Sequence, residues 1–116
     1  MALILYHNPQ CSKSRQTLRL LRDRGEEPEV VEYLKQPPSP GELRVILLKL
    51  GLKPQALFRA GDNKALELDL PDVTELSEDQ IIELMCTHPQ LMQRPILLRD
   101  DRARLGRPPE AVLEIL

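Results

Sequence analysis

The first third of the chain alternates short apolar runs with one longer amphipathic stretch. Residues 2–6 are continuously apolar but too few for a helix, so they predict a strand buried on both faces. From Ser12 the apolar positions recur at helical spacing until Gly25, a residue type common at helix ends. Residues 27–34 are rich in residues that favour extended structure and predict a second strand. A strand, a helix and a strand in this order predict a βαβ unit with parallel strands.

The middle of the chain is predicted to be helical in short pieces. A helix is expected from Ser39, a typical N-cap residue followed by proline, as far as Gly51. Brief helical turns are predicted at 54–58 and 63–70. A longer helix opens at Ser77, where a glutamine three positions further on completes a capping box.

The last part of the chain returns to strands. The apolar run at 95–99, an Asp-Asp turn and the alternating run at 102–105 predict a hairpin, and "RPPEAVLEIL" predicts a closing helix. The order β-α-β, helices, β-β-α indicates an α/β protein and resembles the thioredoxin fold, with an all-helical insertion over about residues 39–92. We expect residues 1–116 to form a single domain, because this length is common for one domain.

Charge and composition exclude several classes of function. The formal net charge is −2, and acidic residues dominate positions 62–83, so no general surface for DNA or RNA is expected. Aromatic residues, on which single-stranded nucleic acids stack, make up only 3% of the chain. No window approaches the roughly 20 apolar residues of a membrane span. The scattered arginines remain compatible with a local anion site.

The chain has two cysteines, and its first residues lack the cationic start of a secretory signal peptide. These features predict reduced thiols in a soluble, cytoplasmic protein. Cys86 lies in the helix predicted after Ser77 and is expected to pack in the core. The histidines and cysteines do not form a convincing set of metal ligands, so no metal is expected.

Cys11 stands between the first strand and the first helix, behind an Asn-Pro turn. Helix N-termini favour negative charge and can bring a thiol pKa into the range of roughly 3.5–7.5. Ser14 follows one helical turn later, His7 lies at the strand end, and Lys13 and Arg15 raise the local potential. We therefore interpret Cys11 as a thiolate nucleophile. The alternative is a small buried hydrophobic residue, as many reduced cysteines are.

The spacing around this cysteine limits its chemistry. Ser14 occupies the position at which a Cys-x-x-Cys oxidoreductase has its second thiol. Serine forms no disulfide, so an oxidised adduct of Cys11 must be resolved by an outside thiol. A phosphatase loop of the form Cys-x5-Arg is excluded because Thr17 stands at the position of its arginine.

Four segments, "YHNPQCSKSR", "ALFR", "QRPILL" and "ARLGRPPEAVLEIL", resemble the ArsC family, the glutaredoxin-coupled arsenate reductases. The likeness runs along essentially the whole chain, with the motifs in the family's order and at similar gaps. The Cys-Ser-Lys-Ser form is similar to the YfgD-like branch of the family, whereas the best-known arsenate reductases have Gly-Thr between the cysteine and the serine.

The resemblance implies a set of site residues. Cys11 would be the nucleophile, and His7 and Ser14 would tune and hold its thiolate. Guanidinium groups match tetrahedral oxyanions, and the family pattern implies an oxyanion-binding triad of Arg59, Arg94 and Arg107. Pro95 is expected to be the cis-proline that opens the third strand of the thioredoxin fold, beside the active thiol.

The activity that the resemblance implies is arsenate reduction in arsenic detoxification. The Cys11 thiolate would attack arsenate or a similar oxyanion, and glutathione would add as a co-substrate. A glutaredoxin would then take over the glutathione, and arsenite would leave. No tightly bound cofactor or metal is expected, and neither nucleic acid nor membrane is an expected partner.

Two other functions stay open. A monothiol-glutaredoxin-like protein would act on glutathione adducts through the same cysteine. A non-enzymatic regulator similar to the Spx proteins, which share this fold and bind RNA polymerase, typically has a Cys-x-x-Cys switch that Ser14 removes. The chain also has Ser12-Lys13 where Gly-Thr is familiar, so Lys13 either contacts the anion or faces water.

Overall fold

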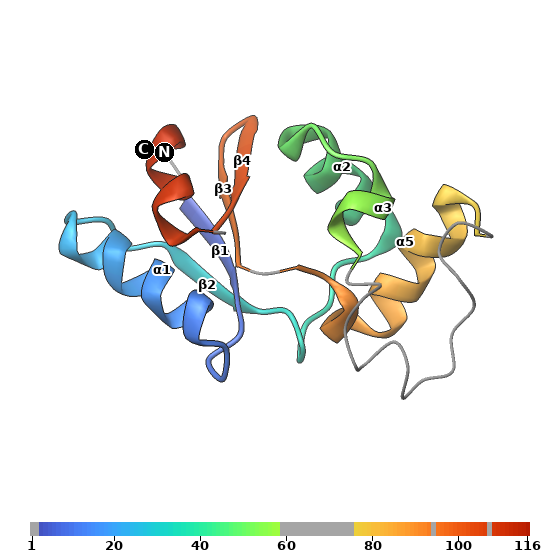
Figure 1. Cartoon of the computed structure of the whole chain (residues 1–116), viewed down its shortest axis with the longest axis horizontal. Coiled ribbons are helices and arrows are strands. Elements are labelled where there is room, and N and C mark those ends of the chain that lie inside the picture. The colour runs from blue at the N-terminus through green and yellow to red at the C-terminus, as the bar shows by residue number, and fades with distance from the viewer. Residues whose placement is uncertain (1–2, 59–75, 94, 107) are drawn as a thin grey trace. The chain divides into compact units, whose positions relative to one another are not determined.

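The computed structural model describes residues 3–58, 76–93, 95–106 and 108–116, shown in colour in Figure 1. These residues divide into two compact units. The first unit combines the two ends of the chain, up to residue 36 and from residue 94 on, and the second consists of residues 37–93. No helix in the described part of the chain is both long enough and apolar enough to cross a membrane.

The first unit is a four-stranded sheet with two helices. Its elements are β1 (Leu3–His7), α1 (Ser12–Asp23), β2 (Glu29–Glu32), β3 (Ile96–Arg99), β4 (Arg102–Leu105) and the 3-10 helix η3 (Pro109–Ile115). The strand order is β2-β1-β3-β4. β1 pairs with β2 in parallel and with β3 antiparallel, and β3 and β4 form an antiparallel hairpin. The predicted parallel βαβ unit and the predicted hairpin are therefore confirmed.

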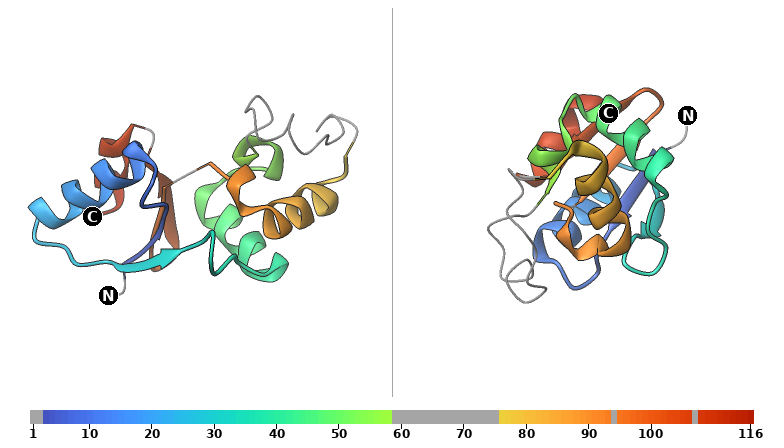
Figure 2. Two further views of the ribbon diagram at one scale, coloured as in Figure 1. Left: turned by 90° about the horizontal axis from the view of Figure 1, so that it is seen from below. Right: turned by 90° about the vertical axis from the view of Figure 1, so that its right-hand side faces the viewer.

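Both helices of this unit pack on the same face of the sheet (Figure 2). Their shared core draws on β1, α1, β3 and η3, and its buried members are Leu3, Leu5, Leu21, Leu97, Val112 and Ile115. Leucine, isoleucine and valine supply these side chains, as expected for a chain that is poor in aromatic residues.

The second unit is helical in its described residues and contains α2 (Pro40–Leu50), α3 (Pro54–Leu57), α5 (Glu78–Thr87) and the 3-10 helix η2 (Pro89–Leu91). Both predicted N-caps are confirmed. The side chain of Ser39 accepts from the Glu42 N–H, and that of Ser77 accepts from the Gln80 N–H, each at 3.2 Å in a complete capping box. Gly51 ends α2 with a φ of 71°, in the left-handed region that favours glycine.

Three details differ from the predictions or lie beyond the described residues. Strand β2 covers only four of the residues predicted at 27–34, because the backbone turns after Glu32, whose carbonyl accepts the Lys35 N–H at 2.9 Å. The closing helix is a 3-10 helix, and its paired prolines supply no N–H donors at its start. The helical turn predicted at 63–70 lies outside the described residues.

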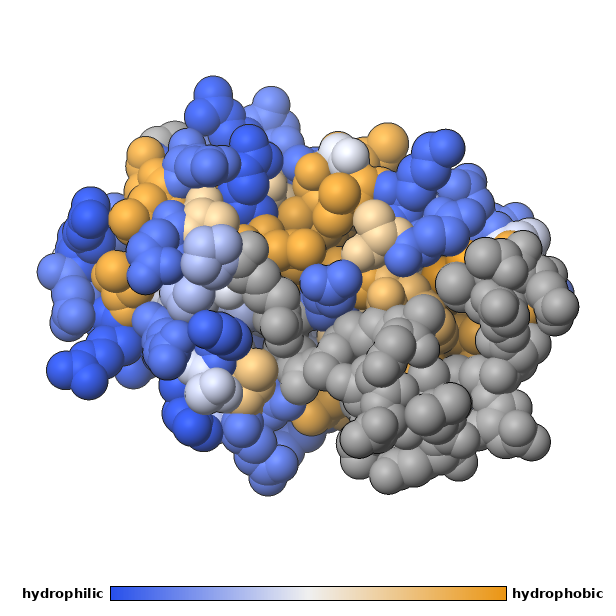
Figure 3. Space-filling model, in the orientation of Figure 1, coloured by the Kyte–Doolittle hydropathy of each residue, from blue (hydrophilic) through white to orange (hydrophobic). Residues whose placement is uncertain are grey.

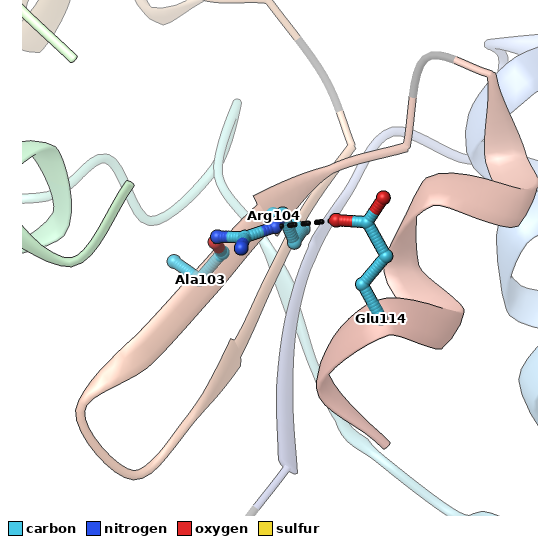
Figure 4. Close-up of polar contacts among 3 residues, drawn as sticks. All are labelled: Ala103, Arg104 and Glu114. Carbon is cyan, nitrogen blue, oxygen red and sulfur yellow. Dashed lines mark hydrogen bonds and ion pairs between the residues drawn. The ribbon is translucent and has the colours of Figure 1, made fainter. Parts of the chain in front are cut away.

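Helix η3 is joined to the sheet by an arginine on β4. In Figure 4, Arg104 Nε approaches Glu114 Oε2 to 2.9 Å, and Arg104 Nη1 donates to the Ala103 carbonyl at 2.8 Å. A single partly exposed ion pair of this kind adds little stability by itself. The buried contacts of Val112 and Ile115 are therefore the main interactions that hold η3 on the sheet.

A glycine allows two loops to approach α1 closely. Gly106, just after β4, donates its N–H to the Pro95 carbonyl at 2.9 Å. A Cβ at this position would lie only 2.6 Å from Pro95 Cγ and 2.6 Å from Thr17 Oγ1. Thr17 is buried, and its hydroxyl also donates to the Lys13 carbonyl at 2.9 Å. Only a residue without a side chain fits between this proline and this threonine.

We expect Gly106→Ala to lower the free energy of unfolding by about 1–3 kcal/mol, because the new methyl group must displace the Pro95 ring or α1. Urea denaturation measures this loss. Adding Thr17→Ala, which removes one of the two close contacts, should recover part of it. The matched control is Gly41→Ala in α2, where nothing lies within 4 Å of the added Cβ. The control should be neutral or slightly stabilising, and an equal loss in both variants would contradict the packing argument.

Candidate active site

The last residues of β1 and β4 and the first residue of β3 lie at the same end of the sheet. In the pairing of β1 with β3, Tyr6 is opposite Ile96, and in the pairing of β3 with β4, Ile96 is opposite Leu105. The residues that follow β1, precede β3 and follow β4 therefore lie at the same end. Pro95 and Gly106 occupy two of these positions, and a Cβ added at Gly106 would meet both Pro95 and Thr17 of α1. The loop that carries Cys11 occupies the third.

Asn8 fixes the turn that leads to Cys11. Its Oδ1 accepts the Gln10 N–H at 3.0 Å, and its backbone carbonyl accepts the Cys11 N–H at 3.0 Å. Its own N–H donates to Ser14 Oγ at 3.0 Å. Proline at the next position restricts Asn8 to extended geometry and fixes its own φ. The predicted Asn-Pro turn is thus a hydrogen-bonded turn of defined shape.

Cys11 is the N-cap residue of α1, as predicted. Its backbone is extended, with φ −94° and ψ 124°, and its carbonyl accepts the Arg15 N–H at 3.0 Å, the first bond of the helix. The side chain is half-buried. The N–H groups of Ser12, Lys13 and Ser14 form the first turn and have no acceptor within the helix. The positive end of the helix dipole therefore lies at the residue that bears the sulfur.

His7 and Ser14 form a buried pair next to this loop. Ser14 Oγ lies 2.8 Å from His7 Nδ1, and the two residues are 0% and 6% exposed, respectively. The serine hydroxyl already accepts the Asn8 N–H. By donating its own proton to Nδ1 it satisfies both groups, and Nε2 then carries the ring proton. The structure thus brings together two of the residues predicted to tune Cys11.

The charge state of His7 follows from its burial. Burial lowers the pKa of this imidazole, the nearby Glu32 carboxylate raises it, and the Arg22 and Arg15 guanidinium groups lower it further. The net direction is downward, so the neutral ring is the dominant form near neutral pH. As a neutral ring, His7 offers nearby groups a hydrogen-bond donor and not a positive charge.

The three predicted arginines, Arg59, Arg94 and Arg107, lie outside the described residues. Several of their chain neighbours are described. Phe58 forms a β-bridge with Met92, and the Gln93 N–H donates to the Leu57 carbonyl at 2.9 Å. In the first unit, Pro95 and Gly106 are hydrogen-bonded to each other against α1. Residues that adjoin the three arginines in sequence are thus paired within each unit.

Two other predicted features complete the picture. Pro95 is buried, whereas the peptide bond whose cis state is predicted begins at Arg94, outside the described residues.

Cys86 lies in α5 of the second unit and is half-buried rather than enclosed in the core. Burial, helped by the Glu42 and Glu83 carboxylates, raises the pKa of the Cys86 thiol and keeps it protonated near neutral pH. Within the described ranges, no three side chains of the His, Cys, Asp or Glu types are placed to hold a metal ion.

The sequence as a whole matches the model of the ArsC family over residues 6–115. The chain is a member of the ArsC family. It is 49% identical over 113 residues to the uncharacterized protein YfgD of Escherichia coli, covering 97% of this chain and 94% of that protein. It is 43% identical over 117 residues to an arsenate reductase of Haemophilus influenzae, with both chains covered completely.

Solved structures agree with this membership. The structure of an arsenate reductase from Vibrio cholerae superimposes with a TM-score of 0.92 at 46% identity, covering 100% of this chain and 98% of that one. The thioredoxin-like fold and the ArsC resemblance inferred from the sequence are therefore confirmed.

The direction of the His7 pKa predicts how stability depends on pH. Well above pH 6.5 the ring is neutral in both the folded and the unfolded chain, so it contributes no pH dependence there. Below that pH the unfolded chain binds a proton that the folded chain resists, so the free energy of unfolding should fall as the pH is lowered. We expect His7→Asn to lose less stability than the wild type between pH 7.5 and pH 5. Urea midpoints at the two pH values test this, and equal losses would contradict it.

Proposed function

We propose that this ArsC-family protein is an arsenate reductase-type thiol oxidoreductase in which the Cys11 thiolate attacks arsenate. The observation that carries the proposal is the position of Cys11 as the N-cap residue of α1, where backbone N–H groups and the helix dipole favour negative charge. Relatives that cover essentially the whole chain are named arsenate reductase, which supports arsenate as the substrate.

The helix start serves both the nucleophile and the substrate. The N–H groups of Ser12, Lys13 and Ser14, which have no acceptor within the helix, favour a thiolate at Cys11 and an oxyanion beside it. The sulfur then attacks arsenic, a bond from arsenic to oxygen breaks, and the departing oxygen takes up protons to leave as water. Donors that are already oriented at the helix start stabilise the charge of this step without reorganising.

Arginines are proposed to hold the remaining oxygens of the anion. Arg59, Arg94 and Arg107 match the family pattern at this function, and guanidinium groups offer paired donors to a tetrahedral oxyanion. The meeting of Pro95 and Gly106 beside α1 supports the proposal, because Arg94 and Arg107 are their neighbours in the sequence.

The electrons are proposed to come from outside the chain. Ser14 stands where a second thiol would resolve the adduct, and its hydroxyl is bound to His7 and Asn8. Two external thiols, one from glutathione and one from a glutaredoxin, supply the two electrons that convert As(V) to As(III). Arsenate and two thiols then yield arsenite, one mixed disulfide and water, and Cys11 is regenerated as a thiol.

The nucleophile is tested with Cys11→Ser. Arsenate-dependent NADPH oxidation, coupled through glutathione, glutathione reductase and a glutaredoxin, should fall to background because a serine hydroxyl is not ionised near neutral pH. Cys86→Ser is the matched control and should retain activity, since its thiol is kept protonated. Arsenate turnover that survives in Cys11→Ser would overturn the assignment. No arsenate turnover by the wild type, with turnover of a glutathionylated disulfide, would instead indicate a monothiol-glutaredoxin-like protein.

The arginines are tested one at a time. Each of Arg59→Ala, Arg94→Ala and Arg107→Ala should lower kcat/KM for arsenate about 10- to 100-fold, the scale of one hydrogen bond to a charged group. Lysine at the same position should restore only part of the loss, because it lacks the planar fork. Arg24→Ala, at the exposed C-cap of α1, is the control for a lost surface cation. If these variants lose no more activity than Arg24→Ala does, the three arginines do not form the anion site.

A further inference from the structure

From the geometry of the Cys11 loop we infer that Arg15 is a positioning residue for the nucleophile, an inference that rests on the proposed function. Arg15 is the fourth residue of α1, and its Nη1 donates to the Pro9 carbonyl at 2.9 Å. The side chain therefore extends back along the helix, past the N-cap, to the turn that precedes Cys11. This direction is the usual one for long side chains on a helix.

The Arg15 bond completes the fixing of the turn. The Gln10 and Cys11 N–H groups are both bound to Asn8, through its side chain and its backbone carbonyl. Among the described residues, the Pro9 carbonyl accepts no backbone N–H, and the Arg15 guanidinium is the donor it receives. Without this donor, the peptide unit between Pro9 and Gln10 is held only through its N–H group, which donates to Asn8 Oδ1.

Arg15 also places a permanent charge beside the loop. A guanidinium stays protonated at any pH of interest and has five N–H donors, of which one is used here. Its field acts on this region, because Arg15 is one of the groups that lower the pKa of the buried His7. The same field favours a thiolate at Cys11 over the neutral thiol.

This contact matters more for function than for stability. The bond is exposed to solvent, and exposed bonds of this kind contribute little to the free energy of unfolding. A turn that shifts slightly, however, moves the sulfur relative to the N–H groups of α1, and catalysis is sensitive to such displacements. The exposed residues of α1 are polar or charged, and on the face shown in Figure 3 the surface at this helix is mostly hydrophilic. Arg15 therefore differs from its neighbours by its contact and not by its type.

Arg19 provides a matched control. It lies one helical turn further along α1 and is also exposed, and within the described residues its side chain has no hydrogen bond or ion pair. Arg19→Met and Arg15→Met remove the same charge and keep a similar aliphatic stem. Arg15→Lys keeps a cation but not the geometry that reaches the Pro9 carbonyl.

The experiment measures two quantities in a Cys86→Ser background, so that Cys11 is the single thiol. The rate of alkylation by iodoacetamide as a function of pH gives the Cys11 thiol pKa, and the coupled assay gives kcat and KM for arsenate. Arg15→Met should raise the thiol pKa and lower kcat/KM about tenfold, the scale of one charged hydrogen bond. In Arg15→Lys the thiol pKa should stay close to that of the wild type, because a cation remains. Its kcat/KM should fall nearly as far as in Arg15→Met, because the bond to the Pro9 carbonyl is lost. Arg19→Met should change neither quantity.

The outcomes separate this inference from the proposed function. If Arg15→Met behaves as Arg19→Met in both measurements while arsenate is reduced, the role of Arg15 is wrong and the proposed function stands. If the wild type does not reduce arsenate but Arg15→Met still raises the thiol pKa, the role of Arg15 stands and the substrate is wrong. Urea midpoints of both variants that match that of the wild type show that the effect is not a loss of folding.

Discussion

The hydrogen bond between Ser14 and His7 is the constraint on which the candidate site depends. It joins the end of β1 to the first turn of α1, and both residues are buried, so neither partner can exchange it for water without cost. Between these two anchors only six residues remain, and Asn8 binds three of the surrounding groups. Cys11 therefore sits on a short segment whose two ends are fixed. Ser14 thus stands where a dithiol oxidoreductase has its second thiol, and it also anchors the segment that carries Cys11.

Ser14 also distinguishes this chain from dithiol oxidoreductases by the bonds that its side chain forms. A thiol one helical turn after Cys11 would be able to form a disulfide within the chain, whereas the Ser14 hydroxyl is committed to His7 and to the Asn8 N–H. The neutral state of His7 completes this arrangement, because a buried imidazolium would need a compensating charge. The thiolate proposed at Cys11 would then draw its electrostatic support from the helix start and from guanidinium groups, which carry charge without the need to titrate.

Much of this architecture could be predicted because it depends on short local patterns in the sequence. Capping serines, Gly51 and the apolar runs of β1 and β3 depend on a few neighbouring residues, and the structure places them as predicted. The membership of the ArsC family was recognisable from separated motifs. The close approach at Gly106 was not predicted, because it depends on Thr17 and Pro95, which are distant in sequence. The early end of β2 and the 3-10 geometry of η3 also depend on backbone hydrogen bonds that side-chain patterns do not specify.

The pairing of the two ends of the chain has a consequence for biosynthesis. Residues 37–93, which form the second unit, leave the ribosome before β3 and β4 exist. The sheet of the first unit is completed only later, because Tyr6 of its central strand pairs with Ile96, and this contact closes a loop of about 90 residues. During translation β1 thus has one unpaired edge, a state in which short apolar strands are prone to aggregate.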